Sequence, residues 1–266
     1  MAAPTLQTYT YQYKDTGILL NGGVALPSVD ITKITGLDMG SVDSIINDVD
    51  GVHGGSVYSK FMSARTIVLD GDVYAAPDDA DGYCDQLISN FIIDDIDYPF
   101  YFKGAYANAA IAQRYIMAKS LGVKFDIDRL RAYGRTPIQL QLAAGDPRKY
   151  IDNANTTMVA GTGYNIVNLG NANSYPVITI TGAFTVINLT NNTTARTVTL
   201  TTTRSAGDIT VVNFADRSVT INGIRNSSVV TTNNWWDIAP LTTTSIKFTV
   251  TGTPTSVVAA TKQAWA

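Results

Sequence analysis

The sequence is poor in the residues from which most enzyme active sites are built. Its 266 residues contain one histidine, His53, and one cysteine, Cys84. A single cysteine excludes an internal disulfide framework, and a single histidine leaves one possible base for a Ser-His-Asp or Cys-His site. The motifs HExxH and GxSxG are absent, as is a phosphate-binding loop with its lysine. We therefore expect no enzyme activity, no cofactor, and no catalytic, cofactor-binding or metal-binding residues.

Charged residues are also scarce. They make up 15% of the chain, whereas the hydrophobic content of 45% is ordinary for a folded protein. The net charge of -3 and the pI near 5.0 argue against a basic nucleic-acid-binding face. No apolar run approaches the ~18 residues that a membrane helix needs. The first residues lack a basic segment followed by an apolar core, so we expect neither a secretory signal nor a membrane partner.

The first 150 residues combine strand patterns with one helix pattern. Apolar residues alternate over 65–73, which predicts a half-buried strand. An apolar stripe with helical spacing follows, and we expect Asp78 and Asp79 to cap that helix. The stripe consists of Cys84, Leu87, Ile88, Phe91 and Ile92. Further strands are predicted over 8–13, 29–34, 98–102 and 136–142, and a hairpin is predicted over 113–128 with its turn at 120–122.

The composition changes near residue 150. The first 150 residues carry 18 acidic and 13 basic side chains, a net charge of −5, whereas the rest carry four and six, a net charge of +2. We place a domain boundary near 147–155, which gives domains 1–150 and 151–266. The second domain is rich in Thr, Asn, Val and Ile and has no helical stretch, a pattern typical of a β-sandwich or jelly roll. Its predicted strands are 164–169, 177–181, 184–189, 196–202, 208–213, 218–221, 245–250 and 256–261.

Two stretches are candidates for contact with other molecules. The glycine-rich loop around His53, Gly54 and Gly55 permits close approach of a neighbour, and with Arg65 it forms our candidate inter-subunit contact. Trp235 and Trp236 lie beside polar residues. Because adjacent strand residues point to opposite faces, we expect one tryptophan in the core and the other exposed. The exposed one is a candidate glycan or partner contact.

Several motifs, in order along nearly the whole chain, resemble the distal tail proteins of long-tailed bacteriophages (siphophages). Each motif alone is weak, and their order and spacing carry the resemblance. One departure is Leu241–Thr244, where that family has a glycine-containing turn. The matching stretches are Ala64–Gly71, Ala144–Tyr150, Asn168–Ala172, Tyr175–Gly182, Val219–Gly223 and Trp236–Pro240.

The resemblance implies a mainly β protein. Residues 1–150 would form a split β-barrel with one flanking helix, like that of tail-tube proteins, and residues 151–266 a galectin-like or jelly-roll sandwich. The barrel domains would assemble into a homohexameric ring at the tail tip of the virion, made in the host bacterial cytoplasm. This ring would join the tail tube protein to the tail-tip hub protein and let DNA pass as cargo.

Two alternatives remain open. The chain could be a major tail tube protein, which shares the barrel but polymerises into long tubes. The sandwich could instead serve as a module that binds a host glycan through Trp235 or Trp236.

Overall fold

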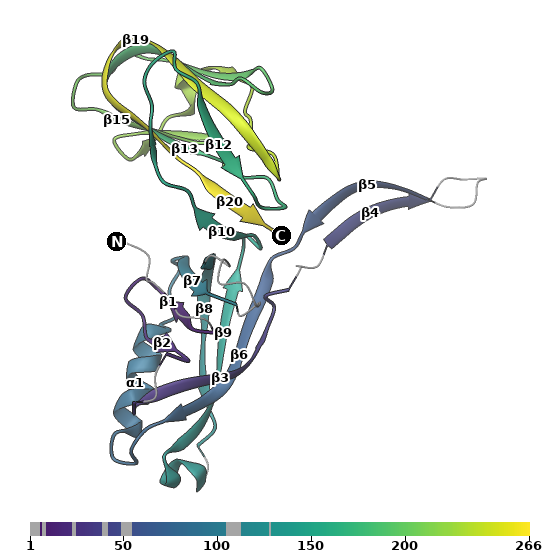
Figure 1. Cartoon of the computed structure of the whole chain (residues 1–266), viewed down its shortest axis with the longest axis vertical. Helices are drawn as coiled ribbons and strands as arrows, with labels where there is room; N and C mark the ends of the chain where they lie inside the picture. Colours follow the sequence, from purple (N-terminus) through teal and green to yellow (C-terminus); the bar gives the residue numbers. More distant parts are fainter. Residues whose placement is uncertain are drawn as a thin grey trace. The chain divides into compact units, whose positions relative to one another are not determined.

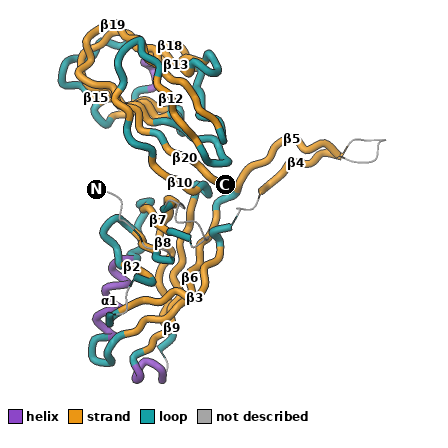
Figure 2. The backbone as a smooth tube through the Cα atoms, in the orientation of Figure 1, coloured by secondary structure: helices purple, strands orange, loops and turns teal. Residues whose placement is uncertain are grey.

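The computed structural model divides the chain into two compact units (Figure 1). It describes residues 6, 9–22, 25–38, 42–48, 55–104, 113–127 and 129–266. One unit comprises residues 1–149 with Ala266, and the other comprises residues 150–265. Strands dominate both units (Figure 2), so the prediction of a mainly β protein is confirmed. No helix among the described residues is long and apolar enough to span a bilayer.

The first unit is built around antiparallel strands in the order β2-β1-β7-β8-β9-β6-β3. Strands β4 and β5 form a separate two-stranded sheet. The elements are β1 (Tyr11–Tyr13), β2 (Leu19–Leu20), β3 (Ser28–Thr35), β4 (Val42–Asp48), β5 (Gly55–Met62), β6 (Arg65–Tyr74), α1 (Ala80–Asn90), β7 (Tyr98–Phe102), β8 (Arg114–Phe125), the 3₁₀-helix η1 (Arg129–Tyr133) and β9 (Arg135–Ala144).

Asn21 joins the two ends of this strand path. It follows β2, and its backbone N–H donates to the carbonyl of Val29 in β3 at 2.9 Å. Its side-chain Nδ2 donates to the Ile31 carbonyl at 3.1 Å, and its Oδ1 accepts from the Ile31 N–H. Asn21 has a φ of 60°, a left-handed conformation that asparagine tolerates better than most residues. These bonds link the end of β2 to β3 and so close the strand path into a barrel at this point.

Apolar side chains from the strands and from α1 fill this barrel. The buried residues include Ile67 and Leu69 of β6, Leu140 of β9, and Leu87 and Phe91 at the end of α1. The helical stripe was predicted correctly at Cys84, Leu87 and Phe91, which are buried. The prediction was wrong at Ile88 and Ile92, which are exposed, because the helix buries Ala80 and Tyr83 instead. The predicted side-chain cap is also absent, since Asp79 at the N-cap makes no such hydrogen bond.

Strand β8 replaces the hairpin predicted over 113–128. It runs without a turn and shifts register between Ser120 and Gly122, where Gly122 has a φ of 121°. The Ser120 hydroxyl donates to the Phe91 carbonyl at 2.7 Å, which ties this bulge to the end of α1. The first half of β8 pairs with β7 and the second half with β9. A glycine in a strand marks either a turn or a bulge, and here it lets one strand bend around the barrel.

The second unit is a β-sandwich organised around its two longest strands. Strands β13 and β19 pair antiparallel over most of their lengths, and each also borders other strands. The elements are β10 (Lys149–Asp152), β11 (Thr156–Thr157), β12 (Tyr164–Asn168), β13 (Val177–Asn191), β14 (Arg196–Thr201), β15 (Ile209–Asn213), β16 (Ser218–Ile221), β17 (Ile224–Arg225), the 3₁₀-helix η2 (Ser227–Val229), β18 (Val230–Asn233), β19 (Thr242–Ala260) and β20 (Lys262–Trp265).

Glycines bend both long strands in the middle. Gly182 in β13 and Gly252 in β19 have φ values of 109° and 134°, and the ladder shifts register on both sides of Ala183. A Cβ at Gly252 would lie 2.6 Å from Phe184 Cα, closer than real Cβ contacts allow. The sequence predicted two separate strands in each case, which was wrong because these glycines make bends within continuous strands.

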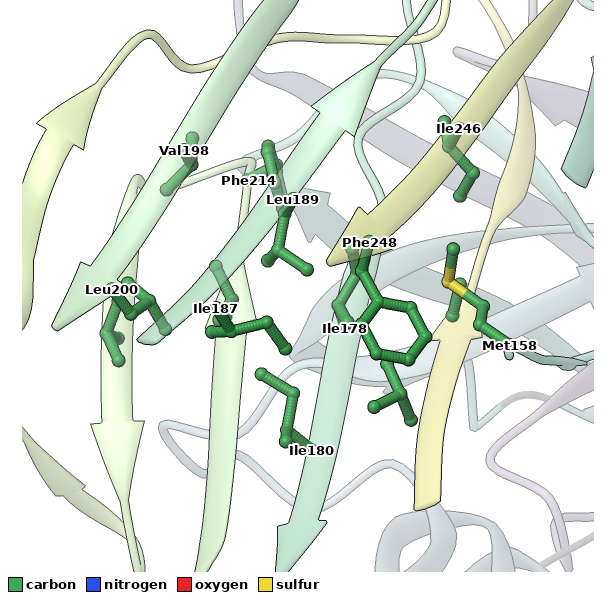
Figure 3. Close-up of a cluster of buried hydrophobic side chains, with 14 of the residues drawn as sticks. Met158, Ile178, Ile180, Ile187, Leu189, Val198, Leu200, Phe214, Ile246 and Phe248 are labelled. Carbon is green, nitrogen blue, oxygen red and sulfur yellow. The ribbon is translucent and has the colours of Figure 1, made fainter. Parts of the chain in front are cut away.

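The bend lets the two halves of β13 serve different parts of the sandwich. The first half pairs with β15 and the second half with β14. Inward-facing side chains of the bent strands meet in the core that Figure 3 shows, with Ile178, Ile187 and Leu189 of β13 near Phe248 of β19. Alternate residues on these strands face solvent, which accounts for the abundance of threonine there.

We predict that Asn21→Ala lowers the unfolding free energy of the first unit by about 2–4 kcal/mol. The change removes two hydrogen bonds at the barrel seam and leaves alanine at a positive φ. Asn21→Gly removes the same bonds but tolerates that backbone, so its loss should be about 1 kcal/mol smaller. Calorimetry with hydrogen exchange of β2 and β3 measures both. Equal stability of Asn21→Ala and wild type would contradict the claim that the Asn21 hydrogen bonds hold β2 and β3 together.

We also predict that Gly252→Ala destabilises the second unit by about 2–4 kcal/mol, because the new methyl group meets Phe184 and φ is positive. Gly207→Ala is the matched control, since no atom lies within 4 Å of a Cβ there. All three tryptophans lie within residues 150–265, so tryptophan fluorescence in urea reports on this unit. If Gly252→Ala and Gly207→Ala lowered the unfolding free energy equally, the claim that the bend at Gly252 excludes a side chain would be wrong.

Candidate functional site

The predicted inter-subunit residues fall in different places. His53 and Gly54 lie outside the described residues. Gly55 is the first residue of β5, which pairs with β4. Arg65 begins β6 and is buried, and its Nη1 donates to the carbonyls of Gly36 and Asp38. Arg65 therefore hydrogen-bonds within its own unit, and its contact with another subunit stays a prediction.

Burial governs the electrostatics around Arg65. Loss of solvent lowers the pKa of its guanidinium, and the nearby charges of Asp38 and Asp146 oppose that shift. Lys149 is also buried and donates to the Asp38 carbonyl at 3.2 Å, and its pKa is lowered by burial and by the neighbouring charges of Arg65 and Arg114. Both cations are thus buried and hydrogen-bonded to backbone carbonyls of the segment that follows β3.

The sheet formed by β4 and β5 has two open edges. The two strands pair from Val42–Met62 to Asp48–Gly55 and hydrogen-bond to no other strand in the described part of the chain. Figure 1 draws this hairpin as an extension of the chain that leads into β6. A lone two-stranded hairpin is marginally stable in water, so the hairpin is suited to pairing with another chain.

An apolar groove lies between the end of α1 and the bulge of β8. It has a volume of about 500 Å³ and its apolar lining comprises Ile88, Phe91, Ile92, Ile93, Leu121 and Val123. Four of these aliphatic side chains are exposed, and Ile93 is 71% exposed. Three acidic residues, Asp94, Asp95 and Asp97, follow the groove residue Ile93 in the sequence. Exposed apolar surface of this kind marks an interaction site.

A second concave surface, which we call the tryptophan hollow, lies on the sandwich. It has a volume of about 90 Å³, and its lining residues belong to separate segments of the sandwich. Trp236 is 3% exposed, and its Nε1 donates to the Leu189 carbonyl at 3.1 Å. Trp235 is half-buried. The lining consists of Tyr175, Arg196, Phe214, Arg217, Trp235, Trp236 and Asp237.

The single cysteine lines neither the apolar groove nor the tryptophan hollow. Cys84 is buried on α1, where burial and the charge of Asp85 raise the pKa of its thiol. In the described residues, no three His, Cys, Asp or Glu side chains come close enough to hold a metal ion.

Comparison with known protein families gives a match, and it lies within the sandwich. Residues 169–262 match the model of the siphovirus-type tail component, C-terminal domain. The match spans most of the second unit, residues 150–265. The resemblance to siphophage distal tail proteins predicted from the sequence is thus confirmed. A comparison with curated proteins gives no match.

Solved structures extend the likeness over both units. The crystal structure of the phage SPP1 Dit protein, described as a paradigm of the hub adsorption apparatus in phages that infect Gram-positive bacteria, has a TM-score of 0.66 at 16% identity. The comparison covers 98% of this chain and 100% of that one. Two structures of the phage P2 baseplate in its activated conformation, with Ca and with Sr, have TM-scores of 0.53 and 0.52 at 9% identity. Each covers 97% of this chain and 98% of the other. At these identities the likeness shows a shared fold.

The tail-component domain contains the whole tryptophan hollow, because all seven lining residues lie within 169–262. The sequence drew attention to Trp235 and Trp236 but missed Arg196 and Arg217. Arg196 begins β14 and Arg217 precedes β16, and both come near the tryptophans only in the fold. It also missed the apolar groove. The run Phe91, Ile92 and Ile93 was the available signal, since a stripe along one side of a helix buries two neighbouring residues but not three.

Proposed function

We propose that this chain is the structural distal tail protein of a siphophage. In this role, six copies form a ring at the tail tip that joins the tail tube to the hub and leaves a channel for DNA. The observation that carries the proposal is the end-to-end likeness of both units to the SPP1 Dit protein, together with the tail-component match of the sandwich. The protein would act by shape and self-association, without catalysing a reaction.

Two features of the first unit support self-association. The hairpin of β4 and β5 offers open strand edges that a neighbouring copy can pair with. The apolar groove offers a surface that gains free energy when it is covered, at roughly 25 cal/mol per Å² of apolar area. Both lie in the domain that would form the ring.

We assign the groove to a neighbouring copy because the same unit carries a complementary surface. The segment 126–134 exposes Ile127 and Tyr133 together with the basic Arg129. The groove is apolar and is followed by the acidic Asp94, Asp95 and Asp97. Contacts between two different surfaces of identical subunits generate a closed ring when the rotation between neighbouring copies closes. Opposite charges at the edges would set the orientation of the contact.

The charge of the first unit supports passage of DNA. Residues 1–150 carry a net charge of −5. A negatively charged channel wall repels phosphates and would let the duplex slide without adhering. A basic lumen in the assembled ring would remove this part of the proposal.

Mass determination of the purified chain by light scattering and native mass spectrometry tests the ring. We expect six copies, or twelve if two rings stack. Long tubes would indicate a tail tube protein instead, and a stable monomer at high concentration would contradict assembly altogether.

For the groove, we predict that Ile93→Asp weakens ring assembly at least about tenfold, because it places a charge in an apolar contact. Ile224→Asp is the matched control: Ile224 is 74% exposed, as Ile93 is 71% exposed, but it lies on β17 of the sandwich. Sedimentation across a concentration series measures both variants. A ring that withstands Ile93→Asp as well as Ile224→Asp would refute the groove as the contact and leave the ring itself in place.

A further inference from the structure

The tryptophan hollow combines an aromatic wall with two arginines. Arg196 is the first residue of β14 and pairs with Asn191 of β13, and Arg217 lies in the turn before β16. Neither guanidinium makes a side-chain hydrogen bond or ion pair within the described part of the chain. Both side chains are exposed. Such arginines are available to bind an anion, for which the guanidinium offers a bidentate fork of donors.

The aromatic wall is rigid. Phe214 is 1% exposed and packs against both tryptophans, with ring centroids 5.2 Å from Trp235 and 4.3 Å from Trp236. The hydrogen bond from Trp236 to the Leu189 carbonyl fixes the inner ring to β13. Trp235 therefore packs against the buried Phe214 ring, while part of its own surface remains exposed. A preorganised aromatic surface binds a ligand without a large cost in side-chain entropy.

An acidic group shares the hollow with the arginines. Asp237 accepts a hydrogen bond from Asn173 Nδ2 at 2.5 Å, which orients its carboxylate. A site built for a bare inorganic anion would gain nothing from a carboxylate, because like charges repel. A carboxylate does accept hydrogen bonds from hydroxyl groups. The lining therefore suits a ligand that carries both an anionic group and hydroxyls.

The size of the hollow limits what can enter it. Its volume of about 90 Å³ is well below the ~300 Å³ at which pockets for drug-sized ligands begin. One carboxylate or phosphate group can occupy it, while a sugar ring attached to that group has to lie outside. Trp235 is half-buried and contributes an aromatic ring of the kind on which a sugar ring packs.

We propose that the tryptophan hollow binds an anionic saccharide. The carboxylate or phosphate of the sugar lies between Arg196 and Arg217, its ring packs on Trp235, and a hydroxyl donates to Asp237. This site goes beyond the assembly role and does not rest on it, since every residue involved lies in the sandwich.

Titration of the full-length protein with small sugars tests this site, read by tryptophan fluorescence and saturation-transfer NMR. The probes are glucuronic acid, glucose 6-phosphate, glucose and inorganic phosphate, each up to about 50 mM, since single-sugar sites fall in the millimolar range of affinity. We expect glucuronic acid or glucose 6-phosphate to bind at least about tenfold more tightly than glucose and inorganic phosphate. The tighter of the two charged sugars identifies the anionic group.

Variants locate the binding. Arg217→Gln and Arg196→Gln should each weaken the charged sugar about tenfold, and Trp235→Ala should weaken it similarly. Arg225→Gln is the control, because Arg225 is an exposed arginine of the same domain outside the hollow. Thermal melting confirms that each variant remains folded.

Three results would overturn the proposal. The first is absence of binding by both charged sugars over the whole range. The second is that glucose or inorganic phosphate binds the wild-type protein as tightly as the charged sugars do. The third is an equal loss of affinity in Arg225→Gln and Arg217→Gln.

Discussion

Strand edges set the main constraint on this protein, because an unpaired row of backbone N–H and C=O groups either meets water or recruits another strand. The first unit satisfies most of its edges by closing a strand path on itself, and Asn21 supplies the last link between β2 and β3. The second unit reaches the same end with two long strands that bend at Gly182 and Gly252 and so border strands on both sides.

The hairpin of β4 and β5 departs from this rule within the described residues. Its edges are open, and it belongs to the unit that also exposes the apolar groove. The open strand edges are polar and the groove is apolar, and both could be covered by a neighbouring subunit. A subunit that assembles with other copies would present such surfaces. The sandwich differs, because its concave surface is small, aromatic and charged. Assembly and ligand binding would thus be divided between the two units.

The sequence predicted the fold class, the helix and most strand positions, because alternation and helical spacing report directly on which side chains are buried. It failed where one residue type has two structural uses. Gly122, Gly182 and Gly252 fit a turn as well as a bulge, and the choice depends on which strand lies alongside. Ile88 and Ile92 have the spacing of core residues, yet Ala80 and Tyr83 supply the buried face of α1. Of the tryptophan hollow, the sequence offered the adjacent tryptophans but not the arginines, since turns distant in the chain meet only through the sandwich.

The barrel seam has a chemical consequence for the ageing of the protein. Asn21 is followed by Gly22, and asparagine before glycine is the pair whose side-chain amide hydrolyses most readily. Here the amide uses both of its polar atoms on Ile31 and is held in a fixed conformation, which hinders attack by the following backbone nitrogen. If hydrolysis did occur, a carboxylate oxygen would replace Nδ2 and face the Ile31 carbonyl, so two acceptors would meet without a proton between them. The lifetime of the closed barrel is then tied to the chemical lifetime of one amide.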